Sequence, residues 1–135
     1  MDFVTLLRRD HEQVASLFQQ IQSGLGDPDS PERHRLFRQL QSELELHAAV
    51  EDLHVYRVFQ QAESTRDEAH DALEAHRQIK ILLDELEAAP AFDHRWVSKF
   101  QELRKAVETH VAAEENEMFR QTQVVMTAQR RRNSA

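Results

Sequence analysis

The chain has 135 residues, a net charge of −7 and no cysteine. It is long enough for one domain with a hydrophobic core, and it has no thiol for disulfides or thiolate metal sites. The negative charge argues against general nucleic-acid binding, no apolar run approaches the roughly 18 residues of a membrane span, and no signal peptide precedes the first predicted helix. We therefore expect a cytoplasmic protein with neither nucleic-acid nor membrane partners.

Four amphipathic helices are predicted in chain order, at residues 3–23, 31–62, 67–89 and 94 to about 126. The few glycines and prolines gather in the short segments between these stretches or at a helix start. Short connections place consecutive helices antiparallel. The expected fold is all-α, an up-down-up-down antiparallel four-helix bundle over residues 1–128, with the basic segment 129–135 as a disordered, solvated tail.

Each predicted helix carries one histidine within its apolar stripe. A single histidine in such a position is usually a satisfied core residue, but one on every helix is a stronger pattern, because a bundle brings these positions to a common interior. The inward histidines are His11, His47, His76 and His110. His34, His70 and His94 fall off the inner faces and are expected to be exposed.

Two of these helices add a glutamate four residues after the histidine, in the pairs His47–Glu51 and His110–Glu114. Four residues advance an α-helix by about 400°, so each pair lies on one face. Imidazole and carboxylate together suit a metal ion, and a buried carboxylate is costly unless it is paired or metal-bound. The six candidate metal ligands are His11, His47, Glu51, His76, His110 and Glu114. A buried, metal-free His–Glu hydrogen-bonded network remains the alternative.

The segments that follow the two His–Glu pairs are also near copies of each other. Tyr56 and Phe119 occupy the same offset from the leading histidine, and so do His54 and Glu117. His54 and Glu117 would face each other one turn beyond the ligands, where they hydrogen-bond ligand side chains or shuttle protons. The other interpretation places both at a partly wet end of the bundle with no special role.

The candidate ligands stand in a pattern that resembles the hemerythrin HHE cation-binding domain. Its parts are Leu6-Leu7-Arg8-Arg9-Asp10-His11, His47-x-x-x-Glu51 with Val55-Tyr56, Glu74-Ala75-His76, and His110-x-x-x-Glu114-Glu115 with Met118-Phe119. The resemblance implies a non-haem di-iron site inside the bundle. By that analogy His11 and His47 hold one iron and His76 and His110 the other, while Glu51 and Glu114 bridge them together with an oxo or hydroxo group.

The sequence departs from the oxygen-carrying members of that family. They have a second histidine four residues before the one matching His76, where this chain has Ala72, and an acid five residues after the histidine matching His110, which here is Glu115. Five residues rotate an α-helix about 140° away, so periodicity favours Glu114 and leaves Glu115 as a candidate neighbour of the ligands. These departures argue against a dedicated oxygen carrier.

The leading hypothesis is a cytoplasmic di-iron protein that binds or reacts with O2, peroxide or NO. The alternatives are a metal buffer or sensor without turnover, and a metal-free helical interaction module. Metal identity stays open, because His/carboxylate sites also accept Mn and Zn. Enzymatic turnover and oligomeric state are open as well.

Overall fold

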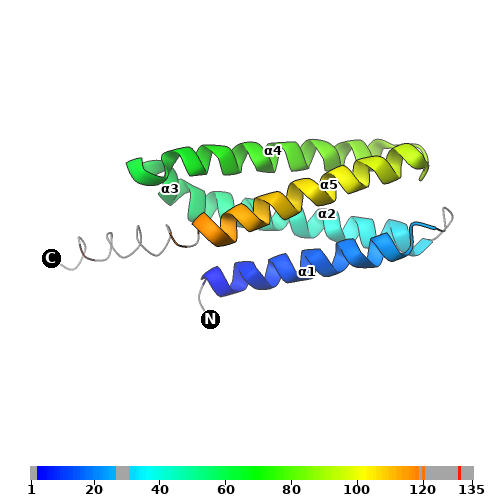
Figure 1. Ribbon diagram of the computed structural model, residues 1–135, viewed down its shortest axis with the longest axis horizontal. Coiled ribbons are helices and arrows are strands. Elements are labelled where there is room, and N and C mark those ends of the chain that lie inside the picture. Colours follow the sequence, from blue (N-terminus) through cyan, green and yellow to red (C-terminus); the bar gives the residue numbers. More distant parts are fainter. Residues whose placement is uncertain (1–2, 27–30, 119, 121–130, 132–135) are drawn as a thin grey trace.

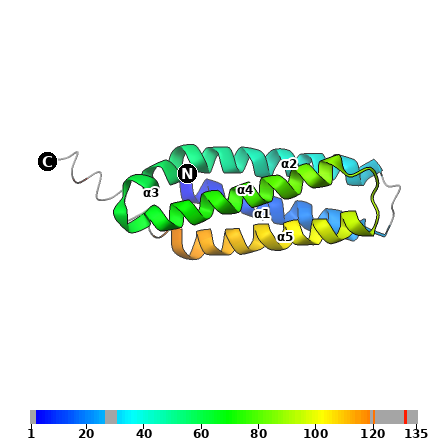
Figure 2. The ribbon, with the colours of Figure 1, turned by 90° about the horizontal axis from the view of Figure 1, so that it is seen from above.

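The computed structural model describes residues 3–26, 31–118, 120 and 131, except for the side chains of residues 3, 4, 54, 55, 58, 117 and 118. Four long helices dominate these residues: α1 (Phe3–Ser23), α2 (Pro31–Glu51), α4 (Arg66–Ala88) and α5 (His94–Ala113). They lie side by side along one axis and alternate in direction (Figures 1 and 2). The predicted all-α, antiparallel four-helix bundle is confirmed.

Hydrogen bonds between exposed side chains show which helices are neighbours. Gln13 of α1 donates to Glu43 of α2, and Lys80 of α4 donates to Glu45 of α2. Lys99 and Glu85 join α5 to α4, and Gln101 joins α5 to Gln22 of α1. The helices therefore form a closed ring in the order α1, α2, α4, α5, and each of them has one face toward a shared interior.

The helix ends follow local chemistry. Before α5, the Asp93 carboxylate accepts hydrogen bonds from the backbone N–H groups of Arg95 and Trp96 at 3.0 and 3.1 Å, which satisfies two donors that the first helical turn leaves unpaired. Pro31 opens α2, where its missing N–H costs nothing. These signals place the starts of α2 and α5 where the sequence predicts them.

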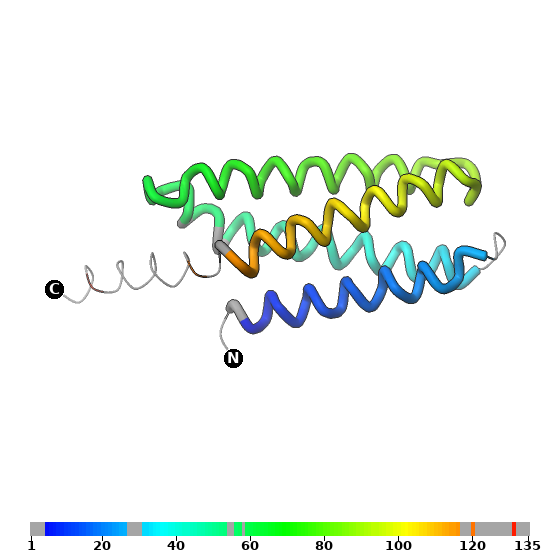
Figure 3. Tube along the Cα trace, viewed as in Figure 1, coloured from blue at the N-terminus to red at the C-terminus, as the bar shows by residue number. Residues whose placement is uncertain are grey.

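The segment predicted as a helix over residues 31–62 is helical from residue 31 to residue 61, but it is not α-helical throughout. α2 ends at Glu51 and is followed by a π-helical turn, η1 (Asp52–Tyr56), then α3 (Arg57–Gln61) and a 3-10 turn, η2 (Glu63–Thr65). A second π-helical turn, η3 (Glu114–Met118), follows α5. Figure 3 traces the chain through η1 and α3 into α4. The predicted continuation of the last helix and the tail division at residue 129 fall mostly outside the described residues and remain untested.

The π-helical turns change which side chains face inward. A π turn closes on the fifth residue instead of the fourth, so a side chain five positions after Glu51 returns toward the same face. Tyr56 and Phe59 are fully buried as a result. An α-helical period would have turned Tyr56 about 140° away from Glu51, which is why periodicity alone did not place it in the interior.

The interior is divided into two apolar clusters of unequal size. The larger one fills the bundle toward the α1–α2 and α4–α5 connections and includes Leu40, Leu83 and Phe100. The smaller one contains Leu7, Tyr56, Phe59, Ala69 and Ala72. On α1, on α4, and on α2 with the η1 turn that follows it, the candidate ligands fall between residues of these two clusters, so the polar side chains form a layer between apolar regions. Among the helices that the structure describes, none is long and apolar enough to cross a membrane.

Leu40→Ala should lower the free energy of unfolding by about 2–5 kcal/mol, because it removes a fully buried side chain from the larger cluster and leaves a cavity. Leu46→Ala is the matched control in the same helix, since Leu46 is 66% exposed, and it should change stability by no more than about 0.5 kcal/mol. Urea denaturation of both variants in the same metal state checks this. Equal losses would show that the core is assigned wrongly.

Candidate metal centre

The structure brings all six candidate ligands to one place in the bundle. They form two groups, and within each group the potential ligand atoms lie within 4.8 Å of one another. The groups are His11, His47, Glu51 and Glu114, and Glu51, His76, His110 and Glu114. The two glutamates belong to both groups, and each group has two imidazoles of its own.

Each glutamate contacts imidazoles from both groups. Glu51 Oε1 lies 2.9 Å from His47 Nε2 and 3.4 Å from His76 Nε2. Glu114 Oε1 lies 2.9 Å from His11 Nε2, and Glu114 Oε2 lies 3.1 Å from His110 Nε2. Within the groups, the Nε2 atoms of His11 and His47 are 3.0 Å apart, and those of His76 and His110 are 2.9 Å apart. Four nitrogens therefore converge on two shared carboxylates.

The two carboxylates are buried in a way that fits a cation. Glu51 is 0% exposed and Glu114 is 1% exposed. Among the described residues, no group donates a well-directed hydrogen bond to Oε1 of either glutamate, although imidazole nitrogens lie 2.9 Å away. Buried polar atoms are normally paired, and atoms that converge without hydrogen-bond geometry are what a metal site requires. The residues present therefore fit a metal ion.

In three of the four imidazoles, the Nδ1 atom contacts a further carboxylate outside the two ligand groups. His11 Nδ1 lies 3.0 Å from Glu115, His47 Nδ1 lies 3.4 Å from Asp10, and His76 Nδ1 lies 3.0 Å from Asp52. Such contacts fix the ring orientation, with Nε2 directed toward the shared glutamates, where a metal ion would bind. Glu115, a candidate from the sequence, takes this role, whereas Asp10 and Asp52 were missed. The available signal was their position directly beside His11 and Glu51.

Tyr56 is a third site residue that sequence reasoning missed, and it contacts both shared glutamates. Its hydroxyl donates to Glu51 Oε2 at 3.3 Å, and it also contacts Glu114 Oε2 closely. Burial raises the pKa of Tyr56, and the charges of the two carboxylates raise it further, so the phenol keeps its proton and remains a donor. The signal was the matched offset of Tyr56 and Phe119 in the near copies, but Phe119 lies outside the described residues.

The remaining histidines are placed as the sequence predicts. His34, His70 and His94 are exposed and none of them belongs to the two groups. The side chains of His54 and Glu117 lie outside the described part of the chain, so the roles proposed for them are not tested.

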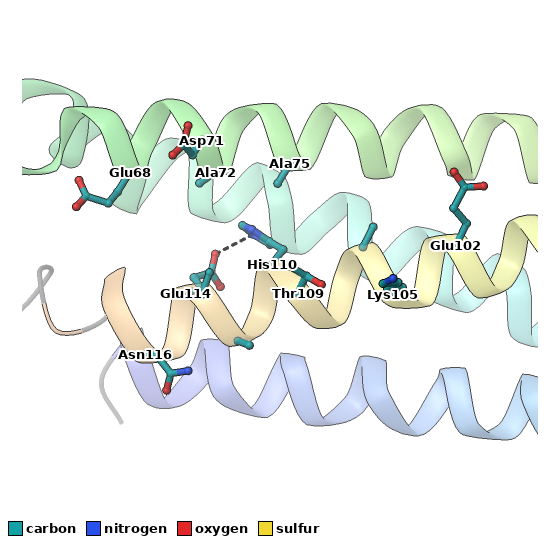
Figure 4. Close-up of a pocket in the computed structure, with 13 residues that line it drawn as sticks. Glu68, Asp71, Ala72, Ala75, Glu102, Lys105, Thr109, His110, Glu114 and Asn116 are labelled. Atoms are coloured by element: carbon teal, nitrogen blue, oxygen red, sulfur yellow. Dashed lines mark ion pairs between the residues drawn. The ribbon is translucent and has the colours of Figure 1, made fainter.

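Ala72 lies beside the centre, in a cleft between α4 and α5. The cleft has a volume of about 820 Å³ and is lined by Ala72, Ala75 and Ala113 along its walls, and by His110 and Glu114. Figure 4 shows His110 on α5 and Glu114 directly after the end of that helix, with Ala72 and Ala75 on the facing helix α4. Because residue 72 is alanine and not histidine, open space remains on the side of the centre that His110 occupies.

The profile of the hemerythrin HHE cation-binding domain matches residues 2–122. The chain belongs to the hemerythrin HHE cation-binding domain family. No curated protein and no solved structure gives a match. The family and the six grouped side chains together make this chain a helical protein with a metal-binding centre.

Without a cation, imidazoles of the hemerythrin-type centre can carry positive charge beside the buried carboxylates. Burial alone lowers the pKa of His47, but contacts with Glu114 and Glu51 raise it to about 10. The pKa values of His11 and His76 are also raised, because contacts with glutamates outweigh burial. Burial raises the pKa of Glu114, but three imidazoles together lower it. Protonated imidazoles can therefore stand in for metal charge, and these protons must leave when a cation binds.

Tyr56→Phe should lower the stability of the metal-free protein and the metal affinity of the centre, without leaving a cavity in the core. The phenyl ring keeps the packing, while Glu51 and Glu114 lose their shared hydroxyl donor, at a cost of about 1–3 kcal/mol in the stability of the metal-free protein. Loss of such an outer partner typically lowers metal affinity about 10- to 100-fold. Urea denaturation and competition with a chelator of known affinity measure the two effects. Unchanged affinity would show that the hydroxyl does not orient the carboxylates.

Proposed function

We propose that this hemerythrin domain binds two iron ions in the bundle and reacts with a small molecule of the class of O2, peroxide or NO. His11 and His47 would hold one ion, His76 and His110 the other, and Glu51 and Glu114 would be shared. The observation that carries the proposal is the overlap of the two ligand groups at these two glutamates. The bridging oxo or hydroxo group expected from the family resemblance is part of the same proposal.

The two imidazoles and two carboxylates of each group suit iron, but they do not select iron over other metals. Each group offers two imidazole nitrogens and carboxylate oxygens from two glutamates, a combination that suits iron and also manganese or zinc. The choice of iron comes from the family. Bound iron would supply the electrons for reaction with an oxidant, and two carboxylates shared by both ions would hold those ions near each other.

The protein's own residues provide the surroundings that such chemistry needs. Tyr56 holds the shared carboxylates through its hydroxyl, and Asp10, Asp52 and Glu115 fix three imidazoles. A space of about 50 Å³ borders the four histidines and is otherwise lined mainly by apolar side chains such as Val14, Ile79 and Val107. It is large enough for a diatomic molecule or a peroxide, and its apolar walls limit water near the imidazoles.

A metal buffer or sensor without turnover would use the same ligands. It differs from the proposed function in that its bound metal does not react with O2, peroxide or NO. A buffer binds and releases its ions without consuming peroxide. Peroxide consumption by the iron-loaded protein, compared with the metal-free protein under identical conditions, distinguishes the two functions. Binding of iron without any reaction toward O2, peroxide or NO would leave the buffer or sensor as the function.

Iron-loaded protein should contain about two metal ions per chain, since six donors with two shared carboxylates suffice for two sites. His47→Ala and His110→Ala should each lose most of one ion. His34→Ala, His70→Ala and His94→Ala are matched controls on exposed positions and should keep the full content. Elemental analysis after gel filtration measures this. An iron-replete preparation without metal would eliminate the proposed centre and favour the metal-free interaction module.

Ala72→His should slow oxidation of the reduced, iron-loaded protein by O2. The new imidazole would stand one turn before His76, in the cleft that already holds His110, where it would add a ligand and displace water. Ala75→His is the control, because it adds an imidazole to the same cleft about 100° away from His76 on the helix. Stopped-flow absorbance after mixing with O2 compares the three proteins. Equal rates for Ala72→His and the unmodified protein would contradict the argument.

A further inference from the structure

We propose that the protein binds a small aromatic carboxylate in a second site, between α2 and the connection from α4 to α5. Arg38 would hold the carboxylate of the ligand, and Phe92 and Trp96 would contact its ring. The site shares no residue with the two ligand groups of the metal centre. This inference therefore goes beyond the proposed function and does not depend on it.

The site is a cavity of about 180 Å³ near the start of α2. Phe37, Arg38 and Gln41 line it from α2, and Pro90 and Phe92 line it from the connection between α4 and α5. Figure 1 shows the start of α2 and this connection at the same end of the bundle. Pockets for drug-sized ligands have volumes of about 300–1,000 Å³, so this smaller cavity suits a ligand with a single ring.

The apolar part of the cavity is aromatic, and its rings are held in place. Phe37 and Phe92 both pack edge-to-face against Trp96, with ring centroids 5.7 and 4.8 Å apart. Trp96 is buried, and its indole N–H donates to the backbone carbonyl oxygen of Leu86 at 3.3 Å. These rings need little rearrangement when a ligand binds, which lowers the cost of binding. A further aromatic ring can extend the same edge-to-face or offset packing.

Arg38 supplies the positive charge of the cavity. Its side chain is exposed, and it forms no ion pair or hydrogen bond among the residues that the structure describes. Arg35, three residues earlier on the same helix, is paired with Glu32. A guanidinium binds a carboxylate through two parallel hydrogen bonds. An unused guanidinium beside aromatic walls therefore favours an organic anion that carries a ring.

The surroundings argue against a cationic ligand, although the acidic residue Glu87 also lines the cavity. The Glu87 carboxylate accepts a hydrogen bond from the Gln41 amide at 2.9 Å, so it already has a partner. The guanidinium carbon of Arg33 lies 4.9 Å from the ring centroid of Phe92 and 5.7 Å from that of Trp96. The protein's own cation thus takes the cation–π position at these rings, and it would repel a second cation there.

Trp96 is the one tryptophan of the chain, so its indole N–H resonance in a ¹H–¹⁵N spectrum reports directly on this cavity. Titration of the purified protein with benzoate should shift that resonance saturably, with a Kd of about 1 mM or below. Acetate has the carboxylate without the ring and should bind at least about 10-fold more weakly. The metal content of the protein does not enter this measurement, so its result is independent of the metal centre.

Two charge variants test the assignment of the anion site. Arg38→Gln should weaken benzoate binding about 10-fold or more, because the carboxylate loses its charged donor. Arg35→Gln removes the same charge from the same helix outside the cavity, and it should leave the Kd within about 2-fold. Equal weakening by both variants would show that benzoate responds only to the general charge of α2, and this would overturn the site.

Two alanine variants test the cavity itself. Ala89→Leu places a larger side chain in the lining and should abolish the saturable shift, whereas Ala88→Leu, one position earlier and outside this lining, should leave it unchanged. Far-UV circular dichroism checks that both variants are folded. Tighter binding of benzylammonium than of benzoate, or no saturation by about 10 mM benzoate, would overturn the proposal.

Discussion

Two carboxylates lie in the middle of the helical bundle, and their negative charge must be neutralised there. The side chains around them provide the groups that can do so. Glu51 and Glu114 are buried between two apolar clusters, where an unpaired charge costs several kcal/mol. Four imidazoles and one phenol converge on them, and their contacts come from every long helix of the ring. The same contacts that make the charges tolerable also join the four helices to one another.

The two halves of the centre are approximately equivalent in their ligands, but their surroundings differ. Each His–Glu pair stands where a long helix meets a π-helical turn: Glu51 is the last residue of α2, and Glu114 is the first residue of η3. One turn brings Tyr56 back to the shared carboxylates, and carboxylates hold three of the imidazoles from outside. Around His110, Ala72 and the α4–α5 cleft leave additional open space. The two halves of the centre therefore differ in access while they share the same ligand types.

Membership of the hemerythrin family accounts for the candidate ligands. It does not determine which reaction a bound metal would undergo, because that depends on the side chains around the ligands. A centre with an alanine at position 72 and an open cleft is less enclosed than one surrounded by imidazoles on all sides. Water access favours oxidation of a bound metal over reversible binding of O2. The physical distinction between a carrier and a reactive centre thus depends on a few side chains beside the ligands.

The sequence by itself determined the four long helices, the inward positions of the six grouped side chains and the exposure of His34, His70 and His94, because all of these follow from an α-helical period of 3.6 residues. Periodicity also preferred Glu114 over Glu115, and the structure places Glu114 inside the centre. The tertiary structure alone decided the π-helical turns, the inward position of Tyr56, the pairing of Asp10 with His47 and of Asp52 with His76, and the cleft beside Ala72. A π turn depends on contacts made across the bundle, and a cleft depends on how two helices pack, so neither leaves a local period that a single sequence reveals.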